Sequence, residues 1–351
     1  MDFTFNEDQE MFRDSVRGLL DRECSPETVR SLWETESGRS ADLWASLAEL
    51  GILGMLAPES GGGLDMNEVD MVLPLIETGR AALPGPVVES AAIATATLRD
   101  LGDAIAEQWL PRLATGEAIA TVGHPGNAFV ADAHVADLLL LHDGDALYAL
   151  TRDHFDCVHQ PGNDPSRKLF RVDRKPGTGI TCATGTRAGQ LAAEAFDRGA
   201  FGCAAQLVGV AQQLVDIAVA YAQQREQFGK PIGSFQAIKH MLATVQVKTE
   251  FAKPLLYRAA NSLAEKRATA SADVSQAKAA CGEAAAAAAK TSLQVHGAIG
   301  YTWECDLQIW MKRAWSLDLA WGSAAWHRAR VADAVLDKTT PAESFGFEAR
   351  V

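Results

Sequence analysis

Apolar residues in the first hundred positions recur at the three- and four-residue intervals of amphipathic helices. The first such pattern follows Asn6, with Gln9 placed three residues later to complete a capping box. Further helices are expected over three stretches, 41–50, 66–79 and 87–101, bounded by glycine and proline turns. The pattern therefore predicts an N-terminal helical domain over residues 1–117.

The pattern changes between residues 118 and 188 to short apolar or alternating runs. These runs are ADLLLLH, ALYALT and LFRVDR, at 136–142, 146–151 and 169–174. Glycine, aspartate, asparagine and proline separate them, which is typical of antiparallel strands joined by turns. We expect a small β domain.

Long helical patterns return over residues 189–351. The expected helices cover 204–224, 235–268, 272–296 and about 306–337. Together they predict a C-terminal helical bundle. The fold class is then mainly α, with the small β domain between two helical domains.

The charge and cysteine content narrow the range of partners. The chain has 351 residues and a net charge of −13, without a basic run, which argues against a nucleic-acid or anionic-membrane partner. Six cysteines lack C-x-x-C spacing, so neither a disulfide framework nor a metal site is expected. We find no leader pattern and expect no membrane-spanning stretch, which predicts a cytoplasmic protein.

The segment REQFGKPI, residues 225–232, lies at the expected end of a helix and is turned by Gly229 and Pro231. Arg225 suits pairing with a phosphate, and Phe228 suits contact with a ring. The alternative is a helix C-terminus with a favourable arginine and a packed phenylalanine. Spacing alone leaves both interpretations open.

The segment QVHGAIGYT, residues 294–302, places two glycines three apart after a long helix. Backbone without a Cβ can approach a ligand closely, although a glycine C-cap and connecting turn explain the same pattern. The segment is not a Rossmann fingerprint, because no strand precedes it. His296 is expected to be a structural or capping residue rather than a metal ligand.

The order of helices, small β domain and helices, with REQFGKPIGSFQ and QVHGAIGYTWE, resembles the acyl-CoA dehydrogenases. LAELGILGMLAPESGGG and ETGRAALPGPVVES are similar to the early helices and loop of that family. The resemblance covers nearly the whole chain, and it implies a reduced, barrel-like middle β domain and a C-terminal four-helix bundle. It implies FAD, an acyl-CoA substrate that gains an α,β double bond, and an electron-transfer flavoprotein or similar acceptor.

The resemblance also implies a set of cofactor contacts. Arg225 is similar to the arginine that pairs with the FAD pyrophosphate, and Gln294 with Gly297 to the groups that line the dinucleotide. Ala298 stands where the second glycine of that pair is usual. In the family these groups reach a flavin bound mainly by the neighbouring subunit. The expected cofactor-binding residues are Arg225, Gln227, Phe228, Ile232, Phe235, Gln294, Gly297 and Ala298.

The chain departs from the family where a glutamate should abstract the substrate α-proton. Alignment of the last helices puts Trp321 at the base position, and the alternative position, upstream of Arg225, falls near Gly199. Neither residue can accept the proton, so we expect no catalytic residue. The usual Thr-Glu-Pro segment beside the flavin ring appears only as 121–125, and the tryptophan strand that backs the ring is not recognisable.

We therefore interpret the chain as a non-catalytic subunit that contributes Arg225 and Gln294 to an FAD shared with a catalytic acyl-CoA dehydrogenase subunit. It resembles the beta-type chains of the paired actinobacterial dehydrogenases of sterol side-chain degradation, which form α2β2 heterotetramers. One alternative is a homo-oligomeric enzyme that uses Asp318, Glu304 or Glu194 as its base. Asp318 is better explained as a solvated or ion-paired surface residue. A flavin-free scaffold is the other alternative.

Tryptophans crowd the C-terminal region, at positions 303, 310, 315, 321 and 326. Packing in the core or at an interface is the default expectation for them. The crowding is also compatible with an occluded acyl cavity.

Overall fold

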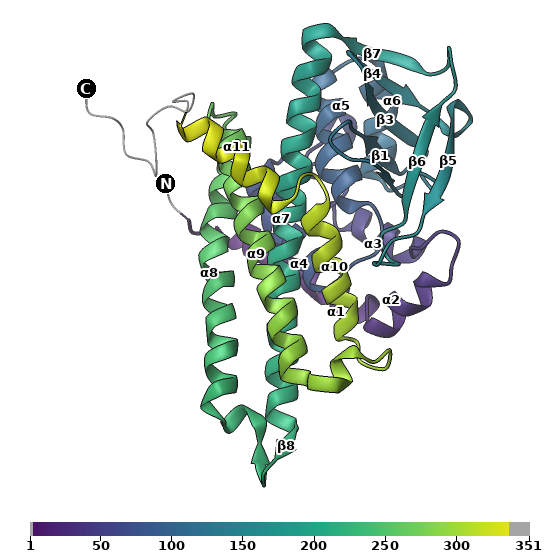
Figure 1. The fold of residues 1–351 in the computed structure, drawn as a ribbon. Helices are drawn as coiled ribbons and strands as arrows, with labels where there is room; N and C mark the ends of the chain where they lie inside the picture. Colours follow the sequence, from purple (N-terminus) through teal and green to yellow (C-terminus); the bar gives the residue numbers. More distant parts are fainter. Residues whose placement is uncertain (1–2, 337–351) are drawn as a thin grey trace, which may run out of the picture.

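The computed structural model describes residues 3–336 and shows long helices beside a smaller group of strands (Figure 1). The strands lie at one end of the molecule, with the N-terminal helices beside them. A bundle of long helices extends away from the strands and ends in a small hairpin. The outermost residues of the first and last predicted domains, 1–2 and 337–351, lie outside the described residues.

The N-terminal part is helical, as the periodicity predicts. Its α-helices are α1 (Glu7–Glu23), α2 (Pro26–Trp33), α3 (Ala41–Glu49), α4 (Glu68–Arg80), α5 (Thr95–Leu101) and α6 (Ala104–Ala114). The predicted capping box is confirmed. The Asn6 side chain accepts from the Gln9 backbone N–H at 2.8 Å, and the Gln9 side chain accepts from the Asn6 backbone N–H at 3.0 Å. The single α-helix expected over 87–101 needs correction, because its first part is the π-helical segment η2 (Val88–Ala94) and only α5 is α-helical.

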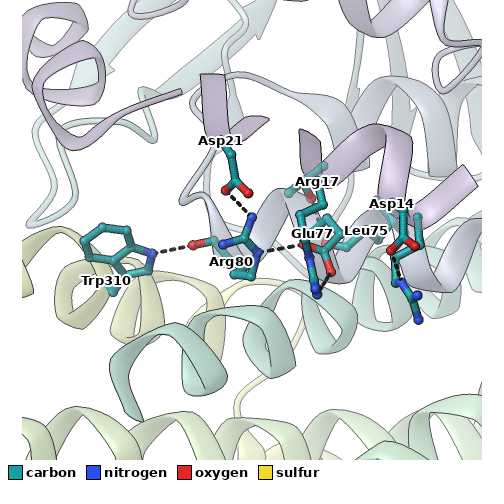
Figure 2. Close-up of polar contacts among 9 residues, drawn as sticks. Asp14, Arg17, Asp21, Leu75, Glu77, Arg80 and Trp310 are labelled. Carbon is teal, nitrogen blue, oxygen red and sulfur yellow. Dashed lines mark hydrogen bonds and ion pairs between the residues drawn. The ribbon is translucent and has the colours of Figure 1, made fainter. Parts of the chain in front are cut away.

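A charged network fixes α1 to α4 (Figure 2). Glu77 is only 1% exposed, and Arg17 donates two hydrogen bonds to its carboxylate, at 2.7 and 3.0 Å. Arg80 donates a third at 2.7 Å and also pairs with Asp21. The indole of Trp310 donates to the Arg80 carbonyl at 2.7 Å, so the same network reaches the C-terminal helices.

The middle region forms two sheets around a small apolar core. The strands are β1 (Ala120–Gly123), β2 (Val130–Ala131), β3 (Leu138–Asp143), β4 (Ala146–Leu150), β5 (Phe155–Gln160), β6 (Leu169–Arg174) and β7 (Ile180–Thr184). Their orders are β1-β3-β4-β7 and β2-β6-β5. The expectation of antiparallel strands holds except for β1 and β3, which pair in parallel. The three runs recognised in the sequence coincide with β3, β4 and β6.

The C-terminal region is a bundle of long helices. Its elements are α7 (Gly185–Gln224), the hairpin β8 (Glu226–Gln227) and β9 (Lys230–Pro231), η4 (Ile232–Ser234), α8 (Gln236–Ala264), α9 (Ala270–His296), η5 (Gly297–Tyr301), α10 (Leu307–Leu319) and α11 (Ala324–Leu336). Two expectations need correction. The helix predicted from residue 204 begins at Gly185, and the helix predicted over 306–337 is two helices with a turn at 320–323.

Glycines allow α4 and α7 to cross closely. A Cβ added at Gly79 would lie 2.5 Å from the Gln206 Cα, and one at Gly209 would lie 2.5 Å from the Arg80 backbone nitrogen. Real Cβ atoms do not approach backbone this closely, so both positions require glycine. This crossing joins the N-terminal helices to the bundle.

Helix α7 is long and apolar enough to cross a membrane by length and composition alone, contrary to the expectation of no such stretch. In the fold, 67% of its most apolar stretch is buried against other elements. Its apolarity is explained by its position at the centre of the bundle, between α4 and α9.

Candidate functional site

The two positions expected for a catalytic base lie against each other. Trp321 is in the turn between α10 and α11 and is 1% exposed. Its indole rests on Gly199 of α7, where an added Cβ would lie 2.6 Å from Cε2 and 2.7 Å from Cε3 of the ring. The indole therefore occupies the space that a side chain at position 199 would need. Neither position supplies a carboxylate.

Several hydrogen bonds hold the Trp321 turn in place. The Trp321 N–H donates to Asn127 Oδ1 at 2.9 Å. Lys278 is buried and donates from Nζ to the Asp318 carbonyl at 2.9 Å and to the Gly322 carbonyl at 3.0 Å. Because Trp321 has a φ of 55°, in the left-handed region, the turn needs these contacts to offset its strain.

His327 also supports the turn. Its Nε2 donates to the Trp321 carbonyl at 2.8 Å, so its Nδ1 accepts from the Ser275 hydroxyl at 3.0 Å. Burial lowers the pKa of His327 to about 4. The ring is therefore neutral at pH 7 and acts as a fixed hydrogen-bonding group.

Aromatic rings pack around the indole. The His124 and Phe196 rings lie 5.7 and 6.1 Å from it, centroid to centroid. Burial lowers the pKa of nearby His142 to about 4, so its imidazole is a weak proton acceptor. Thr121, from the altered segment 121–125, donates its hydroxyl to the Ala131 carbonyl at 2.6 Å. These groups pack the site and leave none in the role of the missing base.

A cavity of about 350 Å³ adjoins Trp321, between α10, η2 and the strands. Glu89 of η2 is its only lining carboxylate among the described residues, and it is 6% exposed. Arg167 lies 3.5 Å from Glu89 and donates to the Ser316 carbonyl and hydroxyl at 3.2 Å. Sequence reasoning missed Glu89. The available signal was a single acid in the apolar run VVESAAIA.

The three substitute bases considered from the sequence do not line this cavity. The Asp318 side chain turns toward α9, where any Cβ at Gly282 would collide with its Oδ1. That oxygen is buried and has no hydrogen-bond partner among residues 3–336, while the residue as a whole is half-buried. Glu194 lies 3.8 Å from Arg198, and Glu304 is exposed before α10.

The predicted FAD-contact residues lie at the opposite end of the bundle from the strands, around the β8–β9 hairpin (Figure 1). Arg225 caps the end of α7, is exposed, and has no ion-pair partner among residues 3–336. Phe228 is 92% exposed at a φ of 54°. The alternative of a packed phenylalanine is therefore wrong. The hairpin presents a cation and an aromatic ring outward.

The structure brings the Gln294 segment to this same end. Tyr221 of α7 stacks on His296 of α9 at 4.2 Å, and Ile232 packs in one apolar cluster with Val295. His296 is buried and its Nδ1 hydrogen-bonds the Ser292 carbonyl at 2.8 Å, which confirms its structural role. Gly297 ends α9 as a C-cap at a φ of 64°, and an added Cβ there would meet open space.

This end of the bundle is chemically suited to part of a dinucleotide. An exposed guanidinium can pair with a phosphate, and the neighbouring aromatic and glycine backbone can contact a ring or sugar. Beside Trp321, the Thr121 hydroxyl is already bonded to the Ala131 carbonyl, and the remaining space is the cavity of about 350 Å³.

The two regions are too far apart to act on one reacting group. Gly199 lies within α7 and Arg225 is its C-cap, 26 residues further along the chain. At 1.5 Å per residue this is about 39 Å. No side chain at the hairpin can reach a molecule held at Trp321 of the same chain.

The described residues hold no cluster suited to a metal ion. No group of three or more histidine, cysteine, aspartate or glutamate side chains within 3–336 is arranged for one. The six cysteines are free, and burial raises the pKa of Cys203 to about 11, so this thiol is protonated and unreactive at neutral pH.

Comparison with known proteins identifies the chain's relatives. Family models described as "Acyl-CoA dehydrogenase, N-terminal domain" and "Acyl-CoA dehydrogenase, C-terminal domain" match residues 6–117 and 188–336. The chain is 34% identical over 310 residues to acyl-CoA dehydrogenase IpdE2 of Mycolicibacterium smegmatis, covering 88% of this chain and 93% of that protein.

Solved structures show the same fold. The ChsE4-ChsE5 complex from Mycobacterium tuberculosis contains a chain that matches with a TM-score of 0.87 and 26% identity, covering 97% of this chain and 100% of that one. A chain of a Tcur3481-Tcur3483 steroid ACAD variant matches with a TM-score of 0.86 and 23% identity, over 95% and 99%. With domain models and relatives spanning almost its whole length, the chain belongs to the acyl-CoA dehydrogenase family.

Proposed function

We propose that this chain is the non-catalytic subunit of a heteromeric, FAD-dependent acyl-CoA dehydrogenase. One observation carries the proposal. The indole of Trp321, at one possible position of the family's base, occupies the space that a side chain would need at the other position, Gly199. Proton abstraction from the substrate requires a carboxylate within hydrogen-bond reach. The chain would leave that step to a partner whose base position is intact.

The chain would contribute the outer wall of the partner's cofactor site. Arg225 pairs with the pyrophosphate, Phe228 lies beside it, and the α9 terminus lines the dinucleotide. The proposed contacts are Arg225, Gln227, Phe228, Ile232, Phe235, Gln294, Gly297 and Ala298. Bound FAD supplies the two-electron acceptor for dehydrogenation. The exposure of Arg225 and Phe228 supports this role, because both are available to a neighbouring chain.

The partner would be a catalytic acyl-CoA dehydrogenase subunit in an α2β2 assembly in the cytoplasm. The names of two similar solved structures, ChsE4-ChsE5 and Tcur3481-Tcur3483, each join two chains, and the second is called a steroid ACAD. We extend this to a steroid-derived acyl-CoA as the substrate class. An electron-transfer flavoprotein would be the acceptor.

Co-expression tests the proposal. The chain is produced alone and with an acyl-CoA dehydrogenase encoded beside it, and flavin absorbance, subunit ratio and acyl-CoA-dependent acceptor reduction are measured. We expect little flavin and no activity in the isolated chain, and both in a complex with equal subunit numbers. Full flavin and activity in the isolated chain would show a self-sufficient enzyme. A stable complex without flavin would indicate a scaffold.

Glu89 provides a control for residual activity. It is the only carboxylate among the described residues that lines the cavity, and the Arg167 guanidinium forms an ion pair with it at 3.5 Å. Glu89→Gln in the complex should leave kcat unchanged if the base belongs to the partner chain. A large loss of kcat with an unchanged subunit ratio would place the base in this chain.

A further inference from the structure

The segment 297–306 joins α9 to α10 and carries two of the proposed flavin contacts, Gly297 and Ala298, at its start. His296, which is buried at the end of α9, fixes where the segment begins. Trp303, near the other end, is 70% exposed, so burial in the core does not hold this part of the segment. Its conformation there depends on contacts made by neighbouring side chains.

A lysine held between two indole rings provides such contacts. Lys312 of α10 is half-buried, and its Nζ lies 4.0 Å from the ring centroid of Trp303 and 5.4 Å from that of Trp33. A cation is attracted to the face of an indole, and the attraction is stronger where water is excluded. The ammonium therefore joins Trp303 to α2, which ends at Trp33. We call these three residues the Lys312 clamp.

Hydrogen bonds connect the Lys312 clamp to the backbone of the segment. Lys312 Nζ donates to Gln308 Oε1 at 2.7 Å, and Gln308 Nε2 donates to the Trp303 carbonyl at 2.9 Å. Thr302 donates from its backbone N–H and from its hydroxyl to the Ile299 carbonyl, at 3.0 and 2.9 Å. Ile299 is next in the sequence to a proposed flavin contact. The clamp and these bonds together restrain the backbone that carries that contact.

The α2 side of the Lys312 clamp is attached to two other parts of the fold. The Trp33 indole N–H donates to the Ser166 hydroxyl at 2.7 Å, in the loop between β5 and β6. Arg30 of α2 forms an ion pair with Asp306, which directly precedes α10. Because these contacts hold Trp33 independently of the segment, it is a fixed surface against which Lys312 can hold the exposed indole.

We infer that Lys312 is a positioning residue for the cofactor, because it holds the segment 297–306 in the conformation that presents Gly297 and Ala298 to the flavin. The inference rests on the proposed function, in which these two residues contact a partner's FAD. The Lys312 ammonium is occupied by Gln308 and the two indoles, so its action on the flavin is indirect. The role requires a cation, and an arginine should fulfil it where an uncharged side chain should not.

Titration of the deflavinated complex with FAD tests the inference through the Kd of FAD, without turnover. We expect Lys312→Met to raise this Kd at least about threefold, the scale of one cation–π contact. Lys312→Arg should return the Kd to within about twofold of wild type. Lys253→Met is the matched control, because Lys253 is also a half-buried helical lysine with a polar partner, in the middle of α8. The control should leave the Kd unchanged.

The subunit ratio, the melting temperature and kcat at saturating FAD should be the same in all these complexes. Trp303→Leu removes the exposed ring of the clamp and should raise the Kd similarly, so it replaces Lys312→Met if that variant does not assemble. An unchanged Kd, or a raised Kd that Lys312→Arg does not restore, would overturn the inference.

Arg225→Ala in the same titration separates this failure from failure of the proposed function. A Kd raised by Arg225→Ala but not by Lys312→Met would overturn only the role of Lys312. A wild-type complex that binds no FAD would overturn both.

Discussion

The contact between Trp321 and Gly199 makes a prediction in which the sign of one mutation depends on the other residue. Gly199→Ala adds a Cβ that would lie 2.6–2.7 Å from two atoms of a fully buried indole. Overpacking of this kind costs about 1–3 kcal/mol. Replacing a helical glycine by alanine stabilises the helix by roughly 1 kcal/mol. The net expectation is a loss of up to about 2 kcal/mol in the free energy of unfolding.

Removal of the indole should reverse that sign. Trp321→Ala alone should destabilise by about 3–5 kcal/mol, because a buried aromatic side chain is lost. In that background Gly199→Ala meets no ring and should stabilise by about 0.5–1 kcal/mol. The coupling energy between the two sites is then about 1–3 kcal/mol, the overpacking cost itself, as expected for residues in direct contact.

Urea unfolding of the four proteins measures this cycle, with Gly189→Ala as the control. Gly189 is an exposed glycine on the same helix, and an added Cβ there meets nothing within 4 Å. The control should stabilise by about 0.5–1 kcal/mol with or without Trp321. A Gly199→Ala effect that is the same in both backgrounds would refute the packing of the indole on position 199.

Three further predictions concern buried charge. Glu77→Ala should destabilise by about 2–4 kcal/mol in urea unfolding, because two arginines lose their shared partner, whereas exposed Glu107→Ala should change it by less than about 0.5 kcal/mol. Burial lowers the pKa of His142 to about 4, below its unfolded value, so the free energy of unfolding should decrease as pH falls from 6.5 to 4. His142→Phe should remove that part of the decrease, and an unchanged pH slope would contradict this prediction. Burial raises the pKa of Asp132 to about 8, so the free energy of unfolding should decrease as pH rises from 4 to 8. Asp132→Asn should flatten this pH dependence, and equal slopes in the two proteins would count against the raised pKa of Asp132.

Local signals made much of the helical structure predictable. Asn6 and Gln9 marked the start of α1 because a capping box is formed by residues only three apart. The runs that became β3, β4 and β6 were recognisable for the same reason, since alternation and turn residues act within one strand. Parallel pairing of β1 with β3 was not predictable, because pairing partners depend on the rest of the domain.

The candidate site depended on longer-range information. The two motifs around Arg225 and Gln294 identified the hairpin end, and the apolar cluster of α7, α8 and α9 explains why they meet. The turn at Trp321 was hidden because the apolar pattern continues across it, while the left-handed φ depends on Lys278, Asn127 and His327 from other elements. The contact of Trp321 with Gly199 likewise required the packing of distant helices.

The exposed Arg225 gives the most direct test of the proposed contribution to a partner's flavin. The complex is purified with wild-type chain, with Arg225→Ala and with the control Arg22→Ala, which removes the same charge from an exposed position on α1. Flavin per catalytic subunit is then measured after gel filtration. We expect the Arg225→Ala complex to lose at least about half of its flavin, because a charge-assisted phosphate contact is removed. The control complex and the subunit ratio should be unchanged. Equal flavin retention in all three complexes would contradict it.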